Sequence, residues 1–142
     1  MDRLNPRIGI LAIAVMALVG GSLAAISDDR MAMNKAIWMH HLQSAMSGDV
    51  EAAINDFADN AVLFTKGRSY SGRDEIRGYL AGFIKAMTPE AAKSMKVDYE
   101  SYSDETIFFN FTVGAWKRSG TNFVVIKDGK FVYVESISYP TE

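Results

Sequence analysis

The sequence predicts an α+β fold in which three N-terminal helices pack on one face of an antiparallel sheet. The main observation is a change in hydrophobic period along the chain. Apolar residues recur at helical spacing up to the neighbourhood of Ser94, and they alternate with polar ones after it. The second observation is that turn residues separate the alternating segments, as expected of consecutive strands.

Three segments carry the helical pattern. The range Met31–Ser47 has an apolar stripe and begins after Asp28 and Asp29, which can cap a helix. Gly48 ends it, and Asp49 starts a second short helix. A third helix runs from Ser71 to Met87 and stops at Thr88-Pro89, because a residue before proline avoids helical angles.

The alternating pattern predicts a short strand at Ala61–Thr65 and four more after Ser94. These four are expected at Met95–Tyr102, Thr106–Lys117, Asn122–Lys127 and Lys130–Tyr139. Neither face of the long segment Ile107–Trp116 carries a charge. One face is expected to receive the helices, and the other to meet a second copy of the chain or a further part of the same chain, so we expect a homodimer.

The first residues have the composition of a secretory signal peptide. Arg3 and Arg7 precede the apolar run Ile8–Val19, and Ser22 and Ala24 stand at the −3 and −1 positions of a cleavage site. We therefore expect residues 1–25 to be a signal peptide, residues 28–142 to be the mature domain, and the protein to be periplasmic or secreted. The alternative is an uncleaved membrane anchor, since the apolar stretch approaches the length of a spanning helix.

Composition excludes several other classes of function. The chain has 142 residues, enough for one domain, and a net charge of −2 without a basic patch, so a nucleic-acid partner is not expected. It has no cysteine, which rules out disulfides and thiolate metal sites. No nucleotide-binding, nucleophile or zinc motif is present, so we predict no cofactor and no metal.

Three segments resemble the nuclear transport factor 2-like superfamily, and the SnoaL-like proteins within it. They are GDVEAAINDFADNA at 48–61, SGRDEI at 71–76 and KDGKFV at 127–132, and they occur in the order typical of that superfamily. The resemblance implies a strongly curved sheet wrapped around the helices, a cone-shaped cystatin-like roll with an internal cavity. It leaves the chemistry open, because this fold hosts enzymes and binding modules alike.

Ketosteroid isomerases of the same superfamily use an aspartate base and two oxyanion donors, a tyrosine and a protonated aspartate. By this comparison the base position falls on Thr65, whose hydroxyl cannot act as a base near neutral pH. The tyrosine position falls on His41 and the second acid near Asn122. The comparison therefore excludes the ketosteroid isomerase reaction, which needs the aspartate base.

His41 is the candidate catalytic residue, because an imidazole can donate, accept or move a proton. Its position on the apolar stripe places it toward the sheet, whereas His40 falls at the edge of the stripe. A core histidine satisfied by a backbone carbonyl or by Tyr79 is the alternative interpretation. The residues expected to contact a ligand are Trp38, His41, Thr65, Tyr79, Phe83, Asn110, Asn122 and Glu135, the last with an outward, solvated position as the alternative.

These observations favour an exported domain that binds a small apolar or amphipathic molecule. Two alternatives remain at this stage. One is an acid/base enzyme of isomerase, dehydratase or cyclase type that uses His41. The other is a non-catalytic dimeric module whose pocket is filled by Trp38, Phe83 and Trp116.

Overall fold

A computed structural model describes the backbone of residues 6–142 and the side chains of residues 27–142. Its elements follow in the order α1 (Pro6–Ser47), α2 (Val50–Asn55), β1 (Phe57–Thr65), β2 (Arg68–Ser71), α3 (Gly72–Ala86), α4 (Pro89–Lys93), β3 (Met95–Tyr102), β4 (Thr106–Val113), a 3₁₀ turn (Gly114–Trp116), β5 (Arg118–Lys127) and β6 (Lys130–Pro140).

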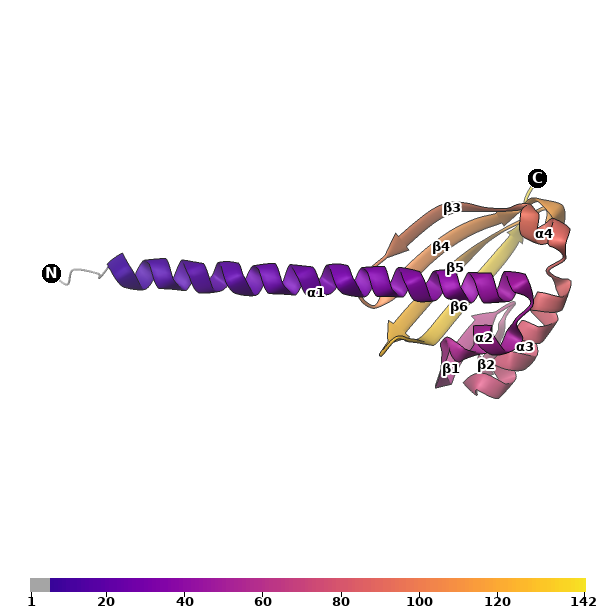
Figure 1. The fold of residues 1–142 in the computed structure, drawn as a ribbon. Coiled ribbons are helices and arrows are strands. Elements are labelled where there is room, and N and C mark those ends of the chain that lie inside the picture. Colours follow the sequence, from indigo (N-terminus) through magenta and orange to yellow (C-terminus); the bar gives the residue numbers. More distant parts are fainter. Residues whose placement is uncertain (1–5) are drawn as a thin grey trace.

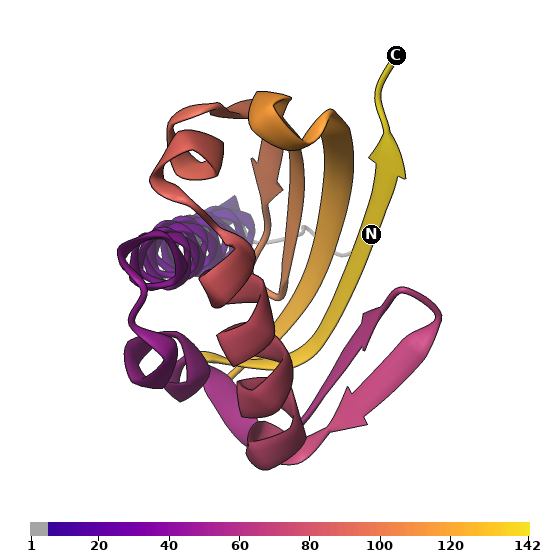
Figure 2. The same cartoon turned by 90° about the vertical axis from the view of Figure 1, so that its right-hand side faces the viewer.

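The strands form one six-stranded sheet in the order β2-β1-β6-β5-β4-β3. Figure 2 shows the sheet curling around the C-terminal part of α1, with α3 and the short α2 beside that helix on the same side. The predicted α+β class and curved sheet are confirmed. The sheet is mixed rather than wholly antiparallel, because β1 pairs with β6 in parallel.

Helix α1 differs from its prediction at the N-terminal end. It is continuous from Pro6, so Asp28 and Asp29 lie inside it and cap nothing. Most residues between 8 and 26 favour a helix, and the two glycines at 20 and 21 each cost only about 1 kcal/mol. The N-terminal part of α1 extends away from the sheet (Figure 1). The predicted signal peptide at residues 1–25 lies outside the residues whose side chains are described.

Several boundaries in the second half were placed wrongly. The long strand stops at Val113 rather than Lys117, because a 3₁₀ turn follows and Lys117 adopts a left-handed conformation with φ 49°. Strand β5 consequently begins at Arg118 and passes through Ser119-Gly120 without a break. Strand β2 and helix α4 were not expected, since both are too short for their period to be visible in the sequence.

The parallel pairing of β1 with β6 fixes the end of α2 against the sheet. The backbone N–H of Phe131 donates to the carbonyl of Asp56 over 2.8 Å, and the Lys130 ammonium donates to the Asn55 carbonyl. Helix α2 begins with Asp49, whose carboxylate accepts from the N–H of Ala52 over 2.9 Å. Asp56 is thereby held at the junction of α2 and β1.

The core lies between the helices and the concave face of the sheet. Its aromatic centre is Trp38 of α1, whose ring lies 5.2 Å from that of Phe109 on β4 and 5.9 Å from that of Phe131 on β6. All three side chains are almost fully buried. They attach the first helix to the middle of the sheet, and edge contacts of this kind add to the area they bury.

Gly120 generates a prediction about the packing of this face. A Cβ at this position would lie 2.5 Å from Cζ of Phe111, its cross-strand partner, and 3.1 Å from the carbonyl oxygen of Ile137. We expect Gly120→Ala to lower the free energy of unfolding by about 1–3 kcal/mol, because the Phe111 ring and the backbone must move apart.

Urea denaturation measures this effect, and Gly78→Ala is the matched control. Gly78 lies inside α3 and has open space at its Cβ position, so that change should raise stability by about 0.5–1 kcal/mol. Equal midpoints for wild type and Gly120→Ala would contradict the packing described.

Candidate functional site

A cavity of about 100 Å³ lies between α1, α3 and the concave face of the sheet. Four of the residues that line it are polar, namely His41, Tyr79, Asn122 and Ser136, and Trp38 adds an indole N–H to an otherwise apolar side chain. The others are mainly apolar, namely Trp38, Leu42, Ala45, Met46, Phe57, Leu63, Leu80, Phe83, Met87, Met95, Phe111 and Val134. Among residues 27–142 no Lys, Arg, Asp or Glu lines it, so the cavity suits an uncharged or weakly polar molecule.

His41 forms part of one wall and is 8% exposed. Its ring stacks on Trp38 at 5.7 Å and meets Phe57 and Phe131 edge-on at 5.5 and 5.2 Å. Its Nδ1 lies 3.2 Å from the carbonyl oxygen of Ala53. A carbonyl can only accept, so Nδ1 carries the proton and Nε2 keeps its lone pair in the neutral ring.

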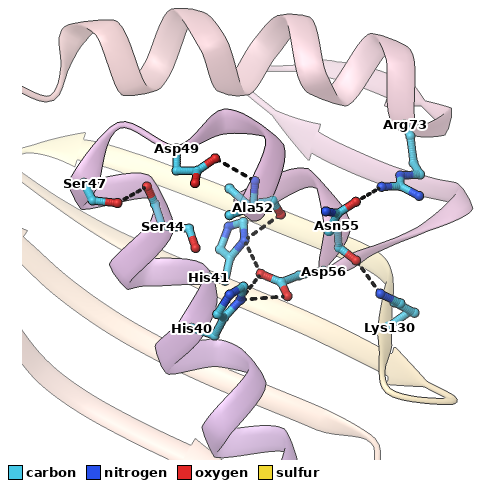
Figure 3. Close-up of polar contacts among 11 residues, drawn as sticks. His40, His41, Ser44, Ser47, Asp49, Ala52, Asn55, Asp56, Arg73 and Lys130 are labelled. Carbon is cyan, nitrogen blue, oxygen red and sulfur yellow. Dashed lines mark hydrogen bonds and ion pairs between the residues drawn. The ribbon is translucent and has the colours of Figure 1, made fainter.

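Asp56 joins the two histidines of α1 (Figure 3). Its Oδ2 lies 3.4 Å from Nδ1 of His41, and both its oxygens lie 3.1 Å from Nδ1 of His40. The Asp56 residue is 8% exposed, whereas the side chain of His40 is 56% exposed. The carboxylate therefore reaches a buried imidazole on one side and a solvated one on the other, and it favours the Nδ1–H form of both.

Tyr79 lines the cavity from α3, stacked on Phe83 at 6.4 Å and close to Tyr70 at 5.0 Å. Burial raises the pKa of the Tyr79 hydroxyl, and a hydrogen bond with the Thr65 side chain lowers it in part. The phenol thus remains a neutral donor over the physiological range. Thr65 itself is buried beside the cavity rather than in its lining.

The sheet contributes a polar row to this otherwise apolar face. Thr65, Ser136 and Asn122 are cross-strand neighbours on β1, β6 and β5, and the next residue in the row is Phe109 on β4. Ser136 and Asn122 line the cavity. The adjacent row is entirely apolar and buried, with Leu63, Val134, Val124 and Ile107 in register. The polar row is therefore a local feature of the cavity wall.

Apart from Thr65, which lies beside the cavity, the predicted ligand-contacting residues separate into two groups. Trp38, His41, Tyr79, Phe83 and Asn122 come together around the cavity. Asn110 and Glu135 lie on the opposite, outer face of the sheet, because their strands place Phe109 and Val134 inward. Asn110 accepts a hydrogen bond from Thr121 there, and Glu135 stands between Phe64 and Phe123 in register. The outward alternative for Glu135 is thus the one the fold adopts.

Sequence reasoning missed Asp56 and Ser136. Ser136 could have been found from alternation, since it lies two residues after the buried Val134 on the same strand. Asp56 gave no such signal. Its approach to His41 depends on the turn between α1 and α2 and on the pairing of β1 with β6, which are long-range features.

No group of three or more His, Cys, Asp or Glu among residues 27–142 could hold a metal ion. Within the same part of the chain no helix is long and apolar enough to cross a membrane.

Solved structures decide the fold. An NTF2-like protein of unknown function from Mesorhizobium loti superposes with a TM-score of 0.64 at 12% identity, over 78% of this chain and 93% of that chain. A cystatin-like fold protein from Burkholderia xenovorans gives a TM-score of 0.62 at 17% identity, over 80% and 95% of the two chains. The chain has the nuclear transport factor 2-like fold.

Another structure with this fold is the epoxide hydrolase/cyclase-like enzyme SalBIII of pyran-ring formation in the polyether salinomycin. It superposes with a TM-score of 0.60 at 16% identity, over 75% of this chain and 90% of that chain. No family model and no curated protein matches the sequence. At these identities the likeness shows the nuclear transport factor 2-like fold and leaves the activity to be argued from the site.

The histidine pair generates a prediction about tautomers. When the imidazole rings of His40 and His41 are neutral, each should carry its proton on Nδ1. Asp56→Ala removes the acceptor of His40 but leaves the Ala53 carbonyl in place for His41. We therefore expect His41 to keep the Nδ1–H form and His40 to lose its preference for it.

Long-range ¹H–¹⁵N spectra of the two rings, recorded for wild type and variant, measure the tautomers directly. Loss of the Nδ1–H form from His41 in Asp56→Ala would show that the carboxylate, and not the carbonyl, fixes this ring.

Proposed function

We propose that this domain binds a small apolar or amphipathic molecule in the cavity beneath α1. The observation that carries the proposal is a cavity with a largely apolar lining and four polar side chains. Trp38 and Phe83 line it without filling it: Trp38 packs onto Phe109 and Phe131, and Phe83 onto the edge of Trp116 at 6.0 Å. This arrangement disfavours a non-catalytic module with a filled pocket.

The size of the cavity restricts the ligand. An engineered apolar cavity of about 150 Å³ in another protein binds benzene, so a cavity of about 100 Å³ takes a molecule of about one ring only when its lining moves apart. Met46, Met87 and Met95 belong to the lining, and Met46 is 44% exposed. Unbranched thioether side chains adapt readily to different shapes, so a somewhat larger molecule can enter when they move.

Acid/base chemistry at His41 is a second candidate function. It is favoured by the contact of His41 Nδ1 with the Ala53 carbonyl and the Asp56 carboxylate, which leaves Nε2 as a base on a residue of the cavity wall. The structural neighbour SalBIII is an epoxide hydrolase/cyclase-like enzyme, in line with this candidate. The binding function does not depend on it.

The cavity predicts different effects for the two histidine variants. His41→Ala should weaken ligand binding by about 1–3 kcal/mol, because it removes a polar group of the wall and opens the aromatic cluster. His40→Ala should change affinity little, since its ring is largely exposed.

Native mass spectrometry of the purified protein identifies a co-purifying molecule, and calorimetry with that molecule measures both variants. Equal affinity of wild type and both variants would make His41 a core residue and remove the acid/base candidate.

We propose that the protein is exported and processed after Ala24 or Ala25. Cleavage there would leave Asp28 and Asp29 in the first turn of the shortened α1, where negative charge stabilises a helix. Intact-mass analysis of protein purified from the cell envelope should show the loss of about two dozen residues. Full-length chain in the membrane fraction would instead support the anchor.

We further propose a homodimer through the outer face of the sheet. Large apolar side chains are exposed on this face: Tyr99 at 55%, Phe108 and Phe123 at 37%, Ile137 at 51% and Tyr139 at 49%. Phe108 and Phe123 are direct cross-strand neighbours, so the patch is continuous at its centre. Exposed patches of this kind on soluble proteins mark interaction sites, and a second copy offers the same aromatic centre, beside which Glu135 lies in register with Phe123.

Light scattering at micromolar concentration should give twice the mass of the chain, and Phe123→Lys should shift it to the monomer by burying a charge in the interface. Gln43→Lys adds the same charge on the exposed side of α1 and should leave the dimer intact. A monomeric wild type would contradict the proposal.

A further inference from the structure

The indole nitrogen of Trp38 is a buried donor without an acceptor. Trp38 is 2% exposed and lines the cavity, and among the described residues its Nε1 has no hydrogen-bond partner. Buried polar groups in folded proteins are nearly always paired, and leaving one unpaired costs about 1–3 kcal/mol. A phenylalanine would fill this position without that cost. The presence of the indole N–H therefore indicates that either a bound ligand or a water molecule accepts its hydrogen bond.

The surroundings of Trp38 point to a ligand oxygen. Its ring packs on Phe109, and Phe109 is the cross-strand neighbour of Asn122. Asn122 is in turn the neighbour of Ser136, so the polar row of the sheet runs toward the tryptophan. All three polar side chains lie in the cavity wall. They offer an indole N–H, an amide and a hydroxyl, each of which can donate a hydrogen bond to an oxygen.

The charge of the lining excludes an ionised ligand group at this end. No lysine or arginine of the described part of the chain lines the cavity, and His41 already directs its Nδ1 proton to Ala53 and Asp56. An anion buried here would lack a counter-charge, which costs far more than a neutral oxygen. A hydrocarbon would leave the Trp38 N–H unpaired. The donors therefore match an uncharged oxygen such as that of a carbonyl.

We propose that Trp38 determines specificity by donating its indole N–H to an uncharged oxygen of a ring-sized ligand, with Asn122 and Ser136 beside it. This inference rests on the proposed binding function and names the class of molecule: neutral, about the size of one ring, with an oxygen acceptor and an otherwise apolar surface.

Two probes of equal shape test the proposal. Cyclohexanone carries the oxygen, and methylenecyclohexane replaces it by a CH₂ group of similar size. Both are titrated into the full, purified protein while ¹H–¹⁵N spectra record the indole N–H signals. Trp38→Phe and Trp116→Phe assign the two tryptophans, and Trp116 is outside the cavity lining, so it serves as the matched control.

We expect cyclohexanone to bind about fivefold more tightly than methylenecyclohexane, the effect of one net hydrogen bond. Cyclohexanone should shift the Trp38 N–H signal downfield, and methylenecyclohexane should not. In Trp38→Phe the preference should disappear while methylenecyclohexane keeps its affinity within about twofold. In Trp116→Phe the preference should persist. If Trp38→Phe fails to fold, the chemical shifts of the Trp38 N–H signal of wild type with the two probes test the proposal.

The failures of the two proposals are distinguishable. Equal affinities of the probes with an unmoved Trp38 signal would overturn the specificity proposal and leave the apolar binding function standing, with the N–H bonded to water. If neither probe perturbs cavity residues in wild type, the proposed binding function falls and the specificity proposal falls with it.

Discussion

The contact between Trp38 and the middle of the sheet organises both the core and the cavity. Trp38 packs on Phe109 and Phe131, which come from β4 and β6 and are fully buried. A single helix thus bridges strands that lie two apart in the sheet, and the sheet curls around that helix (Figure 2). The same curvature keeps α3 at a distance from the far strands and leaves the cavity between them. The curvature of the sheet therefore underlies both the packing of α1 and the cavity.

The position of the histidines depends on that contact and on the parallel pairing of β1 with β6. Trp38 and His41 stack one helical turn apart, so fixing the tryptophan fixes the imidazole. From the other side, the hydrogen bond from Phe131 to the Asp56 carbonyl holds the carboxylate beside both histidine rings. Helix α1 and strand β6, which are far apart in the sequence, thus both act on the His41 ring: α1 carries it, and β6 holds the Asp56 carboxylate beside it. The tautomer of His41 follows from this geometry.

The sequence predicted those features that depend on local period and missed those that depend on pairing. The stripe of α1 placed Trp38, His41 and Ala45 on one face, and all three are buried. The break in the long strand was misplaced because Gly114–Trp116 continues the apolar alternation while its backbone turns. Asp56 was invisible for a different reason. Nothing in the spacing of residues 41 and 56 encodes a contact made by a helix corner and a parallel strand.

The division of the sheet into two faces explains why two of the predicted ligand-contacting residues lie away from the cavity. Asn110 and Glu135 interrupt apolar runs, which suggested a pocket, yet both lie on the outer face among exposed aromatic side chains. The polar interruptions on the inner face are Thr65, Ser136 and Asn122, and they lie in one cross-strand row. A polar row in a buried sheet face costs stability unless a partner satisfies it. The indole N–H of Trp38, which has no partner among the described residues, lies at the end of this row and adds to that cost, so the apolar packing around Trp38 and Phe109 must offset it.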